Sequence, residues 1–196
     1  AKVYEAINEQ VNNELAASHS YLAMSGVCEE LNFPGAAHWF RVQSEEERGH
    51  ALRLFDFIHA RNHGVTLRAI PFEGAQGATL LDVFRASLAQ EERVSAQIDA
   101  LYDVAMQQKE FAAVVELQWF VTEQVEEEKS ARDIIARLEM AGTDTRALLE
   151  IDRELGARAG GAGSAGEAGD ASKRAVASRY SKICALGRGH QRSWTL

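Results

Sequence analysis

The segment FRVQSEEERGHALRLFDF, residues 40–57, carries apolar side chains at the spacing of one helix face, and polar groups interrupt that face near its middle. Positions three residues apart share one side of a helix, so Glu47 and His50 point the same way. A Glu-x-x-His pair alone is a weak motif, because a surface acid beside a surface histidine has the same spacing. Here the pair falls on the apolar face itself, which predicts a carboxylate and an imidazole directed into a core. The positions of that face are Phe40, Gln43, Glu47, His50, Leu54 and Phe57.

The composition indicates an all-α domain. The chain of 196 residues has only 2 Pro, and it is rich in Ala, Glu, Leu and Arg, which favour helices. Its two cysteines, Cys28 and Cys184, make neither a disulfide framework nor a thiolate metal site. No apolar stretch reaches the ~20 residues that a membrane span needs, and the polar first thirty residues do not resemble a signal peptide. We therefore expect a cytoplasmic protein with reduced thiols and no membrane association.

Five helical segments are predicted, over residues 2–30, 33–62, 79–107, 110–141 and 145–155. We expect Asn32 to cap the second helix, with Pro34 in its first turn. Thr79 and Asp82 have the spacing of a capping box at the start of the third helix.

The connections between these helices predict the topology. The first and third joins are only a few residues long, so the helices on either side of each should form antiparallel hairpins. The 15 residues from 64 to 78 can span ~50 Å when extended, whereas a 29-residue helix is ~43 Å long. This crossover can therefore run the length of the bundle and leave the second and third helices parallel. We expect a four-helix bundle with one long crossover, followed by a short fifth helix.

Each of the four long helices carries an acid on its apolar face, close to the middle of the helix. These acids lie within about two residues of the helix midpoints, some ~3 Å along each axis, so they should meet in one layer. Glu92 could replace its neighbour Glu91 as the inward residue if the third helix is rotated.

Buried carboxylates beside an imidazole cannot remain ionised without cations. Oxygen ligands with one nitrogen suit iron(II), manganese or zinc, and a bridging acid favours a pair of metal ions. The four acids are Glu14, Glu47, Glu91 and Glu127.

Over residues 2–155 the chain resembles the bacterial non-haem ferritins. The matching runs are NEQVNNEL at 8–15, EERGH at 46–50, RLFD at 53–56 and LQWFVTEQVEEEK at 117–129. The resemblance implies a ferritin-like bundle and a hollow homo-oligomeric shell of 24 chains. It further implies a ferroxidase that oxidises Fe(II) with O2 or H2O2, and storage of the ferric mineral inside the shell.

The resemblance also implies roles for single residues. Two irons would share Glu47 as a bridging ligand; the full set is Glu14, Glu47, His50, Glu91 and Glu127, with Gln124 beside both irons. A third iron site toward the cavity would use Glu46, Glu123 and Glu126 and share Glu127. The alternative for these three acids is a solvated acidic face. Tyr21 and Trp119 match an aromatic pair beside the two irons, where they either donate electrons or only pack in the core.

Two differences between this sequence and related diiron proteins narrow the choice of family. The fourth helix offers Gln124-x-x-Glu127 and no second Glu-x-x-His, which argues against the symmetric centres of bacterioferritins and diiron oxygenases. Arg48 occupies the place where bacterioferritins, by resemblance, carry a haem-ligating methionine, so we expect no haem.

The segment after residue 155 differs in composition. Residues 156–171 are rich in Gly and Ala and predict a flexible linker. In residues 172–196, Val176, Tyr180 and Ile183 have the spacing of a short amphipathic helix among basic side chains. The formal net charge of the chain is −8, but residues 156–196 carry +5, which leaves −13 for residues 1–155. The tail could dock a protein partner, bind DNA so that the shell protects nucleic acid, or be idle. The sequence leaves open whether it lies inside or outside the shell.

Overall fold

The computed structural model describes residues 2–70 and 77–159 of the chain. Within these ranges the secondary structure consists of five helices: α1 (Lys2–Glu30), α2 (Pro34–Ala60), α3 (Leu80–Gln107), α4 (Phe111–Ala141) and α5 (Thr145–Gly156). This confirms the all-α prediction and the five helical segments, with every end within two residues of its predicted position. None of the described helices is long and apolar enough to cross a membrane. The predicted tail helix and the linker from residue 160 onward lie outside the described residues.

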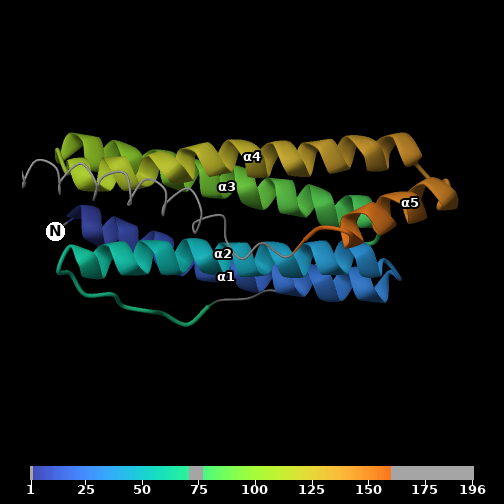
Figure 1. Cartoon of the computed structure of the whole chain (residues 1–196), viewed down its shortest axis with the longest axis horizontal. Helices are drawn as coiled ribbons and strands as arrows, with labels where there is room; N and C mark the ends of the chain where they lie inside the picture. Colours follow the sequence, from blue (N-terminus) through green and yellow to red (C-terminus); the bar gives the residue numbers. More distant parts are fainter. Residues whose placement is uncertain (1, 71–76, 160–196) are drawn as a thin grey trace, which may run out of the picture. The chain divides into compact units, whose positions relative to one another are not determined.

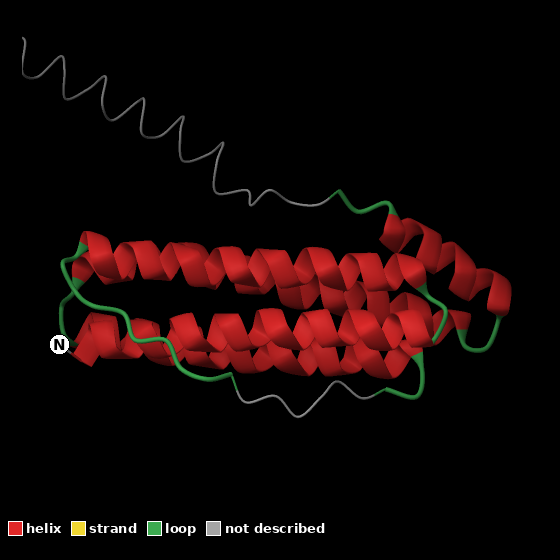
Figure 2. Cartoon of the chain, turned by 90° about the horizontal axis from the view of Figure 1, so that it is seen from below, coloured by secondary structure: helices red, strands yellow, loops and turns green. Residues whose placement is uncertain are grey.

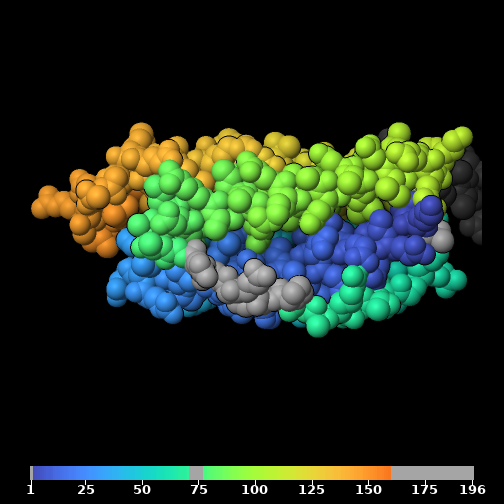
Figure 3. All heavy atoms as spheres, turned by 180° about the vertical axis from the view of Figure 1, so that it is seen from behind, coloured from blue at the N-terminus to red at the C-terminus, as the bar shows by residue number. Residues whose placement is uncertain are grey.

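The four long helices form the predicted bundle (Figure 1). α1 and α2 form one antiparallel hairpin and α3 and α4 form the other, while α2 and α3 run in the same direction. On one face of the bundle α3 lies along α1, as Figure 3 shows. The short α5 packs on α2 and α4 at one end of the bundle. The single long crossover is thus confirmed.

Two asparagines of α1 hold the first part of the crossover against the bundle. Figure 2 shows residues 61–70 leaving the end of α2 and running back along the helices. The Asn8 side chain accepts a hydrogen bond from the Thr66 amide at 2.8 Å and donates one to the Thr66 carbonyl at 3.1 Å. The Asn12 side chain accepts one from the Arg68 amide at 2.9 Å. Side-chain amides therefore satisfy backbone groups that extended loop residues cannot pair among themselves.

The prediction that Asn32 caps the start of α2 is wrong, because Asn32 ends α1 instead. Its φ of 62° is left-handed, and the next amide, that of Phe33, bonds back to the Cys28 carbonyl at 2.9 Å. This pattern is the Schellman motif, which satisfies the last carbonyls of a helix, and asparagine tolerates the left-handed position. α2 then begins after Phe33 without a side-chain cap. The same left-handed turn follows α2 at Asn62 and α3 at Lys109.

At the starts of α3 and α5, side chains cap the helix. At α3 the predicted capping box is present: the Asp82 amide donates to Thr79 Oγ1 at 3.2 Å, and the Thr79 amide donates to Asp82 Oδ2 at 3.0 Å. At α5 the carboxylate of Asp144 accepts from the Arg146 amide at 2.9 Å. These contacts satisfy amides that have no partner within the helix.

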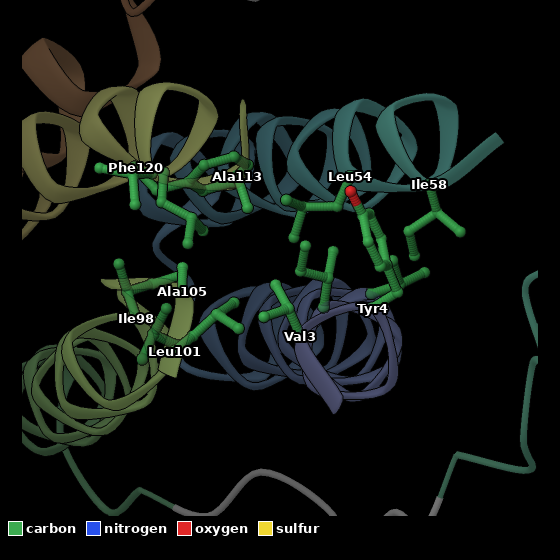
Figure 4. Packing of buried hydrophobic residues seen from close by; sticks show 14 residues of the cluster. Val3, Tyr4, Leu54, Ile58, Ile98, Leu101, Ala105, Ala113 and Phe120 are labelled. Atoms are coloured by element: carbon green, nitrogen blue, oxygen red, sulfur yellow. The ribbon is translucent and has the colours of Figure 1, made fainter. Parts of the chain in front are cut away.

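The apolar core is divided into two clusters along the bundle. The first joins the start of α1 to the later parts of α2 and α3 and the first half of α4; Figure 4 shows its side chains, among them Tyr4, Leu54, Ile98 and Phe120, directed between the helices. The second cluster joins the end of α1 to the start of α2 and α3, the end of α4 and α5, and includes Tyr21. Sequence positions in the middle of the four long helices fall between the two clusters, and the predicted acids are at those positions.

Gly35 allows α5 to dock on the first turn of α2. A Cβ atom at this position would lie 1.8 Å from the Asp152 carbonyl oxygen. The buried Asp152 side chain also accepts a hydrogen bond from the Ala36 amide at 2.8 Å, which caps a free N–H of α2.

We predict that Gly35→Ala destabilises the protein by about 1–3 kcal/mol, because the backbone of α2 or α5 must move to admit the methyl group. Thermal unfolding followed by circular dichroism measures this. Gly49→Ala, in the same helix with nothing within 4 Å of the added Cβ, is the matched control and should be neutral or stabilising. Equal melting temperatures for the Gly35 variant and the wild type would contradict the docking role.

Candidate metal centre

The four long helices each place one acid in the layer between the two apolar clusters. Glu14 comes from α1, Glu47 from α2, Glu91 from α3 and Glu127 from α4, and all four are buried, the first three at 1% exposure. Glu92 is exposed, so α3 turns Glu91 inward. The apolar stripes of the sequence thus place the acids in the interior, where ionised groups need a partner.

Three of the predicted ligands form a close group. Glu14, Glu47 and His50 each offer one ligand atom, and these atoms lie within 4.8 Å of one another. His50 Nδ1 lies 3.3 Å from Glu47 Oε2, as the i, i+3 spacing on α2 requires. Oxygen and imidazole nitrogen atoms at this separation can converge on a single cation.

The hydrogen bonding of this group leaves room for a cation. Both side-chain oxygens of Glu47 and Oε2 of Glu14 are buried and have no hydrogen-bond partner in the structure. Glu14 Oε1 accepts one bond from Gln10 Nε2 at 3.0 Å. Buried polar atoms without partners are rare and costly in proteins, and a bound cation would satisfy these oxygens. The residues present therefore fit a metal ion.

The remaining acids of the layer are held by protein donors. Glu91 accepts hydrogen bonds from the Tyr21 hydroxyl and from Gln124 Nε2, the latter at 3.1 Å. Glu127 Oε2 accepts a bond from Gln43 Nε2 at 2.6 Å. The structure thus brings Glu14, Glu47 and His50 together as one group. It fixes the other two carboxylates through amide and phenol groups.

Burial is the main electrostatic influence on the layer. Burial, followed by the charges of neighbouring acids, raises the pKa values of Glu14 and Glu47 well above the usual range of a carboxyl. Burial and then the charge of Glu91 raise the pKa of Glu127 to about 7. Burial likewise raises the pKa of Tyr21, so its hydroxyl keeps its proton and donates it to Glu91. Without a cation, protons must neutralise part of this layer, and a metal ion would displace them.

The three acids predicted for a third site lie toward the edge of the layer. Glu46 is partly buried and forms an ion pair with Arg158 at 2.6 Å. Burial is the main cause of its raised pKa, to which the nearby charge of Glu123 adds. Glu123 is half-buried and Glu126 is exposed. Their function as iron ligands stays a prediction.

The two predicted aromatic residues contact the layer from opposite sides. Trp119 lies edge-on to His50, with 5.3 Å between ring centroids, and the guanidinium of Arg53 lies 4.1 Å from the centre of the Trp119 ring. The fully buried Tyr21 stacks near Phe40 at 5.9 Å. Both residues therefore pack in the core beside the acids, and electron donation by either stays a prediction. Arg48 is exposed.

Sequence reasoning did not assign a role to Gln10, Gln43 or Arg158. Gln10 lies one turn before Glu14, and Gln43 occupies the apolar face one turn before Glu47. A buried amide one turn from a buried acid is a signal that could have identified both. Arg158 falls in the Gly/Ala-rich segment, and no periodicity marks it.

A four-helix bundle with one long crossover and a buried carboxylate–histidine layer defines a class of metal-binding proteins. The ferritin-like domain family matches residues 4–141 of the chain. The chain belongs to the ferritin-like family, as a member of its bacterial non-haem branch.

Its relatives include proteins from bacteria and archaea. The bacterial non-haem ferritin of Staphylococcus aureus (strain USA300) is 36% identical over 154 residues, which cover 79% of this chain and 93% of the relative. That of Staphylococcus haemolyticus is 34% identical over the same length. An open pore ferritin from the hyperthermophilic archaeon Archaeoglobus fulgidus has a similar structure, with a TM-score of 0.80 and 40% identity over 81% of this chain and 97% of its own.

The raised pKa of Glu127 predicts a pH-dependent stability difference for the metal-free protein. The folded state binds this proton more tightly than the unfolded state, so the stabilisation is complete below about pH 4.5 and is lost as the pH rises toward 7. Glu127→Gln does not ionise, so its stability relative to the wild type should increase over this interval, by at most about 3 kcal/mol. Thermal unfolding of both proteins in chelator, from pH 4.5 to 8, measures the difference.

Glu126→Gln, at the adjacent exposed position, serves as the control for a change of net charge. A stability difference between Glu127→Gln and the wild type that does not vary with pH would contradict the assignment of Glu127 to a buried, ionisable layer.

Proposed function

We propose that this chain is an iron-storage ferritin with ferroxidase activity, which oxidises Fe(II) between its helices and stores the ferric product in a shell. One observation carries the proposal: Glu14, Glu47 and His50 converge within 4.8 Å, and three of their buried oxygens have no protein partner. Membership of the ferritin-like family supports iron as the substrate.

The residues of the layer would form two neighbouring ion sites. Glu14 and His50 would hold the first Fe(II) together with one oxygen of Glu47. The other oxygen of Glu47 is also free of hydrogen bonds and would reach a second ion, shared with Glu91 and Glu127. The two unpartnered oxygens of Glu47 support its assignment as the ligand shared by both ions, whereas Glu91 and Glu127 each already accept a bond from a protein donor.

The anionic ligands also favour oxidation. Carboxylates stabilise Fe(III) more than Fe(II) because of the higher charge of the product, which lowers the reduction potential of the bound iron. A pair of Fe(II) ions supplies two electrons, which reduce O2 to H2O2, or H2O2 to water, with uptake of two protons. Gln124 provides an amide where a second imidazole would give a firmer ligand, which suits an ion that must leave as product.

We infer from membership of the ferritin-like family that the chain assembles into a shell of 24 chains, and the outer surface of the bundle is compatible with contacts between subunits. Large apolar side chains are exposed on α1, α2 and α4, including Leu22, Leu52, Val115 and Val125. Exposed apolar side chains of this kind are compatible with surfaces buried between subunits. We infer that these faces are covered in the assembled particle, which would act in the cytoplasm.

A DNA-protecting or partner-docked shell remains the second candidate, because residues 156–196 carry seven basic side chains against two acidic ones. A gel-shift assay at several salt concentrations, comparing the full chain with a truncation after Ala159, tests it. We expect no DNA binding that depends on the tail; a salt-sensitive shift lost on truncation would favour the alternative.

We predict that Glu47→Ala reduces the initial rate of Fe(II) oxidation by at least about tenfold while the particle still assembles. The variant loses the ligand shared by both ions but also removes an unsatisfied buried carboxylate, so folding should not suffer. Stopped-flow absorbance of Fe(III) and size-exclusion chromatography are the two measurements. Glu45→Ala, two positions earlier and exposed, is the control. Rapid oxidation that survives in Glu47→Ala would overturn the site assignment.

A further inference from the structure

Arg158, two residues beyond the end of α5, is fixed to the bundle through both its backbone and its side chain. Its carbonyl is 2.9 Å from Nε2 of His38, and its guanidinium lies 4.8 Å from the centre of the Trp39 ring. Both contacts are with the first turns of α2. Arg158 also lies outside residues 4–141, which match the ferritin-like family.

The guanidinium of Arg158 forms a two-pronged contact with α2. Nη1 donates to Gln43 Oε1 at 2.5 Å, and Nη2 donates to Glu46 Oε2 at 2.6 Å. Gln43 and Glu46 are three residues apart and so share one helix face. The planar fork of arginine suits two acceptors at this spacing, which the single ammonium of a lysine cannot hold in the same way.

The contact of Arg158 with Gln43 determines whether the nitrogen or the oxygen of the Gln43 amide faces Glu127. Gln43 is fully buried and uses both ends: its oxygen accepts from Arg158, and its nitrogen donates to Glu127 Oε2 at 2.6 Å. A reversed amide would place N–H groups against the guanidinium and an oxygen against the carboxylate. Arg158 thus excludes the reversed orientation and keeps a donor on Glu127.

We propose that Arg158 is a positioning residue for the metal centre, acting on Glu127 through Gln43. The inference rests on the proposed function, since the proposed function assigns Glu127 to the second ion. It makes Arg158, two residues beyond α5, part of the site. The second ion, held by Glu91 and Glu127, depends on Arg158, whereas the first, held by Glu14, Glu47 and His50, does not.

Anaerobic titration of the full-length protein with Co2+, followed by visible absorption and calorimetry, tests this proposal. Co2+ does not turn over, so the readout is independent of oxidation. We expect Arg158→Gln to bind the second Co2+ about tenfold more weakly, with an altered spectrum for that ion, while the first binds as in the wild type. Arg158→Lys should recover only part of the loss. Arg153→Gln, which removes an exposed ion pair on α5, is the matched control and should behave as the wild type.

A double-mutant cycle separates the relay through Gln43 from a general effect on the fold. Gln43→Leu should weaken the second ion by itself, and adding Arg158→Gln should then have little further effect, because the two residues act in one chain of contacts. Additive losses would overturn the relay, as would an Arg158→Gln variant that binds both ions like the wild type. A wild-type protein that binds no pair of Co2+ ions would overturn the proposed function itself and this inference with it.

Discussion

The carboxylates of Glu14 and Glu47 lie inside the bundle, and three of their oxygens have no hydrogen-bond partner while both acids are ionised. A proton taken up by one of these acids can be shared with the other. Two apolar clusters lie on either side of the layer along the bundle. Such a layer is unfavourable while ionised and empty, so it must take up either protons or cations. The same burial that raises the pKa values of these acids therefore creates the affinity for metal ions.

The two halves of the layer are not equivalent. Glu14, Glu47 and His50 leave oxygen atoms free, whereas amide or phenol donors occupy Glu91 and Glu127. An incoming ion would meet unpartnered oxygens at the first group, whereas at the second it would meet carboxylates that protein donors already orient. The difference begins in the sequence, since α4 offers an amide at position 124 where a symmetric centre would have a second imidazole. We infer that the ions bind in order, and that the second leaves more readily.

Most of the fold could be predicted because it depends on local patterns. The three- and four-residue spacing of apolar side chains predicts each helix, and the interruption of that spacing by Glu47 and Glu127 predicts which acids turn inward. The helix end at Asn32 could not be predicted in the same way, because asparagine suits both an N-cap and a left-handed C-terminal position. Arg158 could not be predicted either. It meets Gln43 from 115 residues away, and only the docking of α5 brings the two together.

Anomalous diffraction from crystals soaked anaerobically with Fe(II) tests the central claim most directly. We expect the first peak among Glu14, Glu47 and His50. At higher concentration a second peak should appear ~3.5–4 Å away, on the far oxygen of Glu47 and toward Glu91 and Glu127. Peaks confined to exposed acids, with the layer between the two apolar clusters empty, would contradict the assignment of this layer as the site of iron binding.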